Sequence, residues 1–275
     1  MLGKRVLTAV IGIPVAVYII NFGAWLFAAT ITLLALVAWH EFSQMMQTKK
    51  INVQYGFGFV GVILIQGCVW LGNGQEVAAV ILLIVLLAMS KAVISHSSYD
   101  MSGAAFTVLG TLYISLPFSH LLLLRFTEQN GYIATALGPL STGAAYLWLA
   151  FLGTWASDTF AYFVGSSFGR RKLCPAISPG KTYEGAAGGL IGSIAGVAAI
   201  GTLIGLPLFH SLFIGLLVGI AAPLGDLAES ALKRFTGVKD SGNILPGHGG
   251  VLDRFDAIMF SVPVVYYYVR VFFVA

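Results

Sequence analysis

Long apolar runs separated by short polar segments fill this sequence of 275 residues. Each run is about 15 to 25 residues long, the length of helix that crosses the hydrocarbon core of a bilayer. Because backbone groups in hydrocarbon must bond internally, the runs are predicted to be helices. We place nine, centred near residues 13, 33, 64, 85, 114, 154, 195, 219 and 265. The pattern predicts an all-α integral membrane protein, a polytopic bundle of about nine transmembrane helices.

The segment 103–165 can be divided in two ways. Pro117, Pro139 and the polar patch at 125–131 could bound one helix or two shorter ones, and an even number of helices would place the C-terminus inside. The basic residues favour the odd number. With a cytoplasmic N-terminus, thirteen Lys and Arg side chains fall inside and only Arg125 and Arg270 fall outside, as the positive-inside rule requires.

Composition supports a membrane protein. Hydrophobic residues make up 58% of the chain, charged residues 9%, and the mean hydropathy of +0.89 excludes a soluble globule. The net charge of +4 is too small to indicate nucleic acid. Cys68 and Cys174 lack the spacing of a metal site or a disulfide framework and are predicted to be free thiols. The N-terminus lacks a cleavage site and is interpreted as a retained first helix.

Three glycines at spacing i, i+4, i+8 clear one face of the helix centred near 195: Gly188, Gly192 and Gly196. Such a face allows close packing against a neighbouring helix, and a homodimer interface is the alternative use. Seven of the eleven acidic residues lie between Asp158 and Asp256. We therefore predict scaffold helices over 1–140 and a catalytic transmembrane region with cytoplasmic active-site loops over 141–275.

The segment APLGDLAESALKRF combines polar residues with a helical pattern. Asp226, Glu229, Ser230 and Lys233 recur at three- and four-residue spacing, which places them on one helix face. An aspartate in a membrane helix is a functional candidate by default. The alternative is a salt bridge from Asp226 to Lys233 or to the adjacent Arg234.

The segment GHGGVLDRFD brings a histidine and two aspartates together. Its glycines permit tight turns around His248, and Asp253 and Asp256 fall one helical turn apart at the start of the last helix. Either aspartate could instead be a helix cap. His248 could be a general base or a phosphate donor, or it could cap a turn.

Carboxylates without cysteine and with little histidine describe a hard, oxygen-ligated site. Such a site suits Mg²⁺ or Mn²⁺ and not zinc. Magnesium usually keeps waters and binds substrate phosphates, whose charge neighbouring cations would neutralise. The cations near the carboxylates are Lys233, Arg234, Lys239 and Arg254.

The basic segment GRRKLCPAISPGKTYEG, residues 169–185, could hold a nucleotide triphosphate. It lacks the glycine spacing of a P-loop. The alternative is an orientation signal or a binding site for anionic lipids.

The segment from Ser230 to Asp256 resembles the signature of the phosphatidate cytidylyltransferases, also called CDP-diacylglycerol synthases. The matching positions are Ser230, Lys233, Arg234, Lys239, Asp240, Pro246, His248, Gly249, Gly250, Asp253, Arg254 and Asp256. The segments from Ser157 and Asp158 to Gly165 and from Ser178 to Gly185 also resemble that family. Gly180 stands where many relatives carry Lys, which removes one phosphate contact.

The resemblance implies transfer of CMP from CTP to phosphatidate in the bilayer, with Mg²⁺ as the metal. It leaves open whether a second cation takes part. It implies Asp226 and Asp253 as metal ligands with Asp256 in support, and a cytoplasmic site in a bacterial inner membrane. Implied phosphate and nucleotide contacts are Lys233, Arg234, Lys239, Arg254, Ser178, Lys181 and Thr182, with Asp158, Ser230 and Asp240 beside the substrates. A CTP-dependent lipid kinase, a cytidylyltransferase for an isoprenoid lipid, and a transporter are the alternatives.

Overall fold

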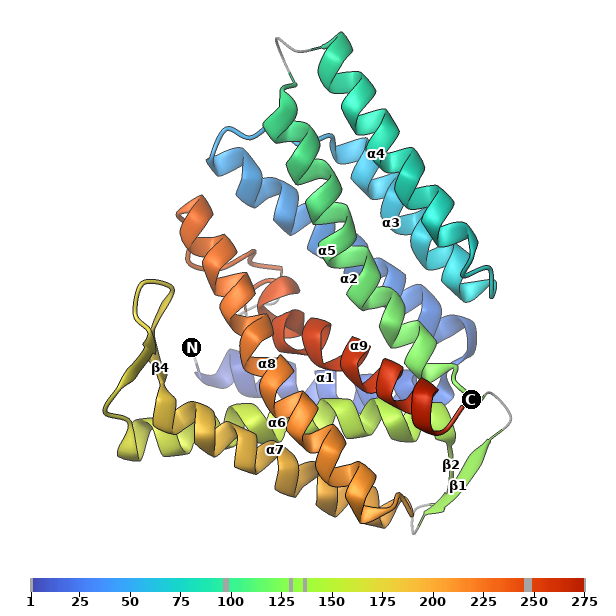
Figure 1. The fold of residues 1–275 in the computed structure, drawn as a ribbon, viewed down its shortest axis with the longest axis vertical. Helices are drawn as coiled ribbons and strands as arrows, with labels where there is room; N and C mark the ends of the chain where they lie inside the picture. The colour runs from blue at the N-terminus through green and yellow to red at the C-terminus, as the bar shows by residue number, and fades with distance from the viewer. Residues whose placement is uncertain (1, 96–98, 129–130, 136–137, 245–248, 275) are drawn as a thin grey trace. The chain divides into compact units, whose positions relative to one another are not determined.

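The chain folds almost entirely into helices (Figure 1). The computed structural model describes residues 2–95, 99–128, 131–135, 138–244 and 249–274. Nine helices lie in these ranges, one at each predicted position, so the predicted all-α fold is confirmed. They are α1 Leu2–Phe22, α2 Ala24–Thr48, α3 Tyr55–Trp70, α4 Glu76–Ile94, α5 Met101–Arg125, α6 Thr142–Phe168, α7 Tyr183–Leu203, α8 Leu208–Thr236 and α9 Leu252–Phe272.

Six of the helices in the described residues are long and apolar enough to cross a membrane: α2, α4, α5, α7, α8 and α9. The apolar part of α1, Gly12–Phe22, and helix α3 are shorter. Large side chains exposed along α4, such as Leu82, Leu86 and Val93, provide an apolar surface that lipid can cover. The chain is therefore a polytopic integral membrane protein, and nine crossings stay a prediction.

Two short antiparallel hairpins interrupt the helical pattern, and the sequence did not predict them. The first, β1 Tyr132–Thr135 with β2 Gly138–Ser141, lies between α5 and α6. It follows that segment 103–165 holds two helices, with Pro117 inside α5. The second, β3 Lys172–Cys174 with β4 Ser178–Thr182, is formed by the basic segment before α7. Cys174 and Cys68 are free thiols, as predicted.

The chain forms two compact units, each built from separate stretches of sequence. Unit 1 contains residues 1–123 and 233–254, which hold α1 to α4, most of α5, the end of α8 and the start of α9. Unit 2 contains residues 124–232 and 255–275, with both hairpins, α6, α7 and most of α8 and α9. The predicted boundary at residue 140 separates scaffold helices from a catalytic region, and this division of function stays a prediction.

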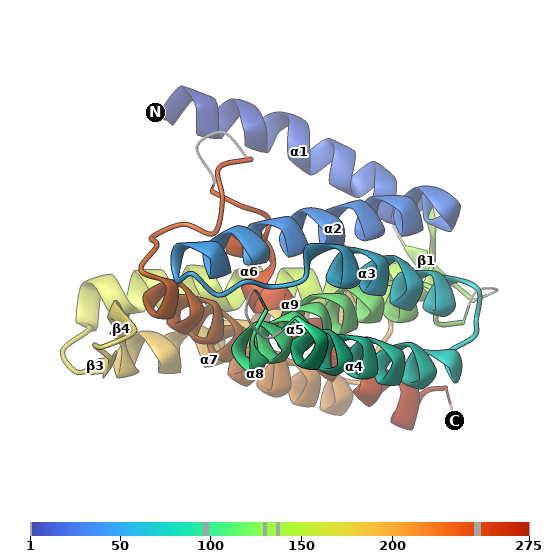
Figure 2. The same cartoon turned by 90° about the horizontal axis from the view of Figure 1, so that it is seen from above.

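In unit 1, consecutive helices pack as antiparallel neighbours. The chain reverses at Gly23, whose φ of 65° suits glycine, and α2 then runs back (Figure 2). Trp39 of α2 is fully buried, stacks on Phe42 and donates from its indole N–H to the carbonyl of Tyr55, 3.0 Å away. Gly58 of α3 leaves room for the Trp39 ring. These contacts fix the start of α3 against α2.

Helix α5 satisfies its buried hydroxyl groups mainly through its own backbone. The side chains of Thr107, Thr111 and Ser115 each donate to the carbonyl four residues earlier, at 2.5 to 2.7 Å. Thr107 also accepts from the backbone N–H of Gln54 at 2.9 Å. Because polar groups in a membrane interior are costly without partners, these bonds allow α5 to be buried.

In unit 2, α6 and α7 pack along their lengths, and the predicted glycine face forms the contact (Figure 1). A side chain at Gly188, Gly192 or Gly196 would meet α6, coming within 2.6 Å of Val164, 2.5 Å of Phe160 and 2.9 Å of Ala156. The face therefore serves packing within the chain. The alternative use as a homodimer interface loses its basis at these positions, while dimerisation itself stays a prediction.

Candidate active site

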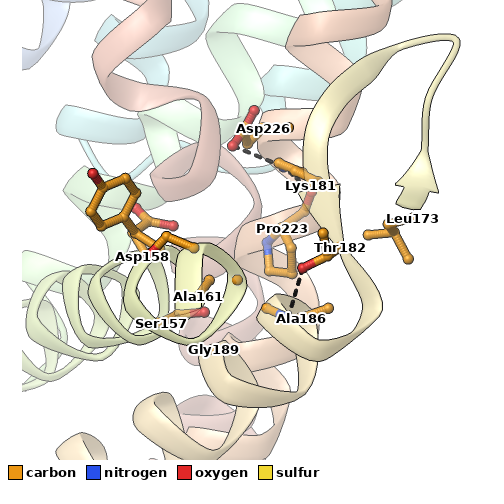
Figure 3. Close-up of a pocket in the computed structure, with 15 residues that line it drawn as sticks. Ser157, Asp158, Ala161, Leu173, Lys181, Thr182, Ala186, Gly189, Pro223 and Asp226 are labelled. Atoms are coloured by element: carbon orange, nitrogen blue, oxygen red, sulfur yellow. Dashed lines mark hydrogen bonds and ion pairs between the residues drawn. The ribbon is translucent and has the colours of Figure 1, made fainter. Parts of the chain in front are cut away.

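A cavity of about 420 Å³ lies in unit 2, between α6, α7, α8 and the β3–β4 hairpin (Figure 3). Small residues of α6 and α7 form much of its wall. Its polar lining comes from three elements: Ser157, Asp158 and Ser166 of α6, Lys181 and Thr182 of β4, and Asp226 of α8. The structure thus brings together Asp158, Lys181, Thr182 and Asp226, four of the predicted site residues. They are separated by up to 68 positions in the sequence.

An ion pair between Lys181 and Asp226 borders this cavity (Figure 3). The Nζ atom of Lys181 lies 2.8 Å from Oδ2 of Asp226 and also donates to the carbonyl of Pro223, at 3.2 Å. Ser230, one helical turn further along α8, donates to Oδ1 of Asp226 at 3.2 Å, as the predicted spacing requires. The side chains of Lys181 and Asp226 remain 22% and 38% exposed. The pair is therefore accessible to a ligand.

The alternative salt bridge from Asp226 to Lys233 or Arg234 is replaced by this pair. Asp226 contacts Lys181, which lies 45 positions earlier on another element, and Lys233 contacts Asp253. Sequence spacing suggested partners on the same helix, whereas the hairpin brings a cation from outside it. The basic segment before α7 therefore contributes directly to the cavity.

Asp158 places a second carboxylate in the cavity, one turn before Tyr162 on α6. The charges of Asp158 and Asp226 are near enough to interact with each other, and Lys181 acts on Asp158 as well. Two carboxylates facing one space can share a cation, and a lysine beside them can bind an anion. The cavity thus has groups of both signs for a metal and a phosphate.

The β3–β4 hairpin positions Lys181. Its strands pair Lys172 with Thr182 and Cys174 with Ser178, so that Lys181 and Thr182 lie at the end next to α7 and Ser178 lies nearer the turn. Thr182 caps α7, because its hydroxyl accepts from the N–H of Gly185 at 3.1 Å. This cap was not predicted. It fixes the residue next to Lys181, while a nucleotide contact of Ser178 or Thr182 stays a prediction.

Asp256 lies close to the residue that precedes Asp226. Gly225 packs directly on the backbone of Asp256 and Ala257, where a side chain would overlap the carbonyl of Asp256. Oδ1 of Asp256 accepts from the N–H of Ala257 at 2.8 Å. A small residue at 225 therefore allows α9 to approach α8 beside Asp226, and the supporting role of the Asp256 side chain stays a prediction.

A second cluster, in unit 1, surrounds Asp253. Its Oδ1 forms an ion pair with Nζ of Lys233 at 2.7 Å. Its Oδ2 accepts from the N–H and the hydroxyl of Ser241, both at 2.9 Å, and from the N–H of Gly250 at 2.8 Å. The side chain is 7% exposed. Asp253 therefore holds the loop residues Ser241 and Gly250 against the first turn of α9, and both its alternative as a helix cap and its role as a metal ligand stay predictions.

Glu41 of α2 belongs to the same cluster, and the sequence analysis missed it. It is 2% exposed, and its carboxylate accepts from the N–H groups of Val251 and Leu252 at 2.8 and 2.9 Å. It lies in the predicted scaffold segment 1–140, where no site residue is expected. One signal was available: a carboxylate inside an apolar run needs a partner.

The other predicted cations are placed at the surface. Arg234, Lys239 and Arg254 have exposed side chains, as does Asp240. His248 lies outside the described residues, so its predicted role is not tested. Among the described residues, no three His, Cys, Asp or Glu side chains gather as a metal-binding group. A cation in the unit 2 cavity would therefore have few protein ligands, which is typical of Mg²⁺ bound together with substrate phosphates.

A lysine and two carboxylates line one cavity, and two of the helices around it, α7 and α8, are long and apolar enough to cross a bilayer. Such groups can bind a phosphate and a metal ion. The sequence matches the Cytidylyltransferase family over residues 3–272. The chain belongs to that family, and the predicted family and nucleotidyltransferase class are confirmed.

Relatives named phosphatidate cytidylyltransferase cover nearly the whole chain. The Bacillus subtilis protein is 34% identical over 279 residues, which cover 98% of both sequences. The Staphylococcus haemolyticus protein is 36% identical over 267 residues, covering 94% of this chain and 95% of its own. The Staphylococcus aureus protein is 35% identical over 263 residues, with the same coverage. The similarity therefore includes the first 140 residues, which the sequence motifs alone did not reach.

Proposed function

We propose that this protein is a phosphatidate cytidylyltransferase, which transfers CMP from CTP to phosphatidate and releases pyrophosphate. Membership of the Cytidylyltransferase family supports nucleotidyl transfer. The names of relatives that match almost the full length support phosphatidate as the acceptor. The observation that carries the proposal is the cavity with Lys181 and Asp226, because it supplies a phosphate-binding cation within helices that border lipid.

The reaction requires positioning more than acid–base chemistry. A phosphate oxygen of phosphatidate attacks the α-phosphorus of CTP, a P–O bond forms there, and the bond to the β-phosphate breaks to release pyrophosphate. The attacking phosphate monoester is already anionic near neutral pH, since its second pKa is about 6, so no general base is needed. Lys181 binds phosphate oxygens and reduces the repulsion between the two anions.

Mg²⁺ fits the donors of the cavity. Asp158 and Asp226 offer hard carboxylate oxygens in one space, and Asp226 would hold the metal with Asp158 in support. When bound, the metal supplies positive charge that stabilises the transferring and leaving phosphates. Asp226 would then contact the metal in place of Lys181, and the amino group of Lys181 would be available to bind a phosphate. Asp253 and a second cation remain part of the proposal through the family resemblance alone.

The remaining predicted residues serve the phosphates and the acceptor. Arg234, Lys239 and Arg254 form a basic surface in unit 1, and Lys233 lies beside Asp253 in a largely buried ion pair. We place the site on the cytoplasmic side of a bacterial cytoplasmic (inner) membrane. The thirteen-to-two distribution of basic residues in the nine-helix topology supports that side.

The position of the label in CTP tests the function. The detergent-purified protein is given phosphatidate, Mg²⁺ and CTP labelled at either the α- or the γ-phosphate. The proposal expects α-label in the lipid product, γ-label in pyrophosphate, and loss of turnover with a chelator. Glu76→Gln is the control, because Glu76 is an exposed carboxylate at the start of α4 and should leave turnover unchanged.

The other outcomes separate the alternatives. Transfer of γ-label to the lipid would identify a lipid kinase. In a parallel assay with an isoprenoid phosphate in place of phosphatidate, transfer of α-label only to that lipid would assign a different acceptor. If neither label reaches any lipid acceptor while the protein remains folded, the enzyme proposal is wrong and a transporter becomes the better interpretation.

A further inference from the structure

Glu41 binds a segment that lies more than 200 positions away in the sequence. Its Oε1 accepts from the N–H of Val251 at 2.8 Å, and its Oε2 accepts from the N–H of Leu252 at 2.9 Å, across separations of 210 and 211 residues. The hydroxyl of Ser241 lies 3.3 Å from Oε2. One buried carboxylate of α2 thus holds the start of α9 and a residue of the loop before it.

The backbone of α9 explains why a carboxylate suits this position. The first N–H groups of a helix have no partner within the helix and carry partial positive charge. Here Val251 and Leu252, at the start of α9, donate to Glu41, while Gly250, just before the helix, donates to Asp253. An anion often binds at such a helix start. In this protein the chain's own glutamate occupies that place.

Ser241 links the two carboxylates. Its hydroxyl lies 2.9 Å from Oδ2 of Asp253 and 3.3 Å from Oε2 of Glu41, and its backbone N–H donates to Asp253 as well. Because a hydroxyl donates only one proton, Ser241 favours the nearer carboxylate at any moment. The orientation of Asp253 therefore depends on groups that Glu41 holds.

The backbone of the loop packs closely against the Glu41 carboxylate. A side chain at Gly242 would come within 2.7 Å of the Glu41 carboxylate, and one at Gly250 would come within 2.6 Å. The loop thus approaches the carboxylate from both sides. A loosened loop would lose these contacts together.

We propose that Glu41 is a positioning residue, which holds Ser241 and the start of α9 so that Asp253 keeps Lys233 in place for phosphate binding. Lys233 lies 2.7 Å from Asp253, and both side chains are largely buried, so a displaced Asp253 displaces the lysine. The inference rests on the proposed function for the use of Lys233. The holding of the loop by Glu41 does not depend on it.

The variant Glu41→Gln tests the proposal in the full-length protein. Glutamine keeps the size of the side chain, but its amide nitrogen would face one of the two donating N–H groups. We expect trypsin to cut after Lys239, an exposed residue of the loop, about 10-fold faster, because opening the loop loses fewer charge-assisted hydrogen bonds. We also expect kcat/KM for CTP to fall about 10- to 100-fold, the cost of a misplaced binding group.

Two further variants make the test specific. Ser43→Ala is the matched control, since Ser43 is buried on the same helix and donates only to the carbonyl of His40, so it should leave both measurements unchanged. Glu41→Asp keeps the charge and should recover part of the lost kcat/KM, which a general loss of stability would not explain. If Glu41→Gln cannot be purified, Ser241→Ala should raise the trypsin rate and lower kcat/KM in the same way.

Each outcome either supports or overturns the proposed role of Glu41. Faster cleavage together with a lower kcat/KM supports the proposal. An unchanged trypsin rate means that Glu41 does not hold the loop, and faster cleavage with normal kinetics means that the held loop does not position Lys233; either result overturns the proposal. Absence of cytidylyl transfer in the wild-type protein overturns the proposed function, while the trypsin rates still report on Glu41.

Discussion

Two lysine–aspartate pairs of nearly equal length occupy very different surroundings. Lys181 and Asp226 in unit 2 lie 2.8 Å apart beside a cavity and remain 22% and 38% exposed. Lys233 and Asp253 in unit 1 lie 2.7 Å apart, are 15% and 7% exposed, and Asp253 has three further donors. The first pair can exchange partners when a ligand binds, whereas the second can separate only if its loop rearranges. The distance from lysine Nζ to the aspartate oxygen does not distinguish the two pairs.

The two ion pairs of this membrane protein serve different purposes. An exposed pair contributes little to stability because water competes for both partners. A buried pair that loses one partner leaves an uncompensated charge, which is strongly destabilising. Asp226 is therefore expected to matter for the reaction and Asp253 for the shape of the loop.

The largest effect is expected from Asp253→Asn. The amide cannot accept from Lys233 and the loop donors together, and it leaves the buried lysine without its counter-charge. We expect the free energy of unfolding to fall by about 3 to 5 kcal/mol. Thermal unfolding in detergent measures the loss. A stability equal to wild type would show that the Lys233–Asp253 pair is not structural.

Asp226→Asn should reverse the pattern, with a large loss of activity and a small loss of stability. The variant removes a carboxylate from the cavity, and we expect kcat to fall about 100- to 1,000-fold, as for other groups that stabilise transition-state charge. Steady-state assays with CTP and phosphatidate measure kcat, and thermal unfolding should stay close to wild type. Near-normal turnover would remove Asp226 from the site.

Thr182→Ala should produce the smallest effect and separate capping from binding. The variant removes the acceptor for the N–H of Gly185 at the start of α7, and loss of such a cap costs about 1 kcal/mol. Thermal unfolding measures this shift. Thr182→Ser, which keeps the hydroxyl, should match wild type. If the KM for CTP is higher than wild type in the alanine variant and equal to wild type in the serine variant, Thr182 is assigned a direct nucleotide contact.

The helices could be predicted from the sequence because hydropathy and bilayer thickness determine them together. Apolar runs must be helical in hydrocarbon, and all nine described helices lie where the runs are. The packing of α7 on α6 was also predictable, since glycines at four-residue spacing allow few other uses. The two hairpins were not predicted, because short strands at a membrane surface leave no strong apolar pattern.

The site was predicted in its residue types and only partly in its pairings. Asp226 and Lys181 were both candidates, but their contact depends on the register of the β3–β4 hairpin, which local spacing does not reveal. Glu41 was missed for a related reason. A hydrogen bond that spans 211 residues depends on tertiary structure, and a single glutamate in an apolar run gives no indication of its partner.

The hydrogen bonds between Glu41 and the start of α9 can form only late in the synthesis of the chain. Helix α2 leaves the ribosome well before residues 241–252 exist, about 10 to 40 seconds earlier at about 5 to 20 residues per second. During that interval the Glu41 carboxylate lacks the amide donors that it has in the finished fold. The synthesis of α9 supplies them, so a carboxylate made early and a helix start made about 200 residues later form this contact together.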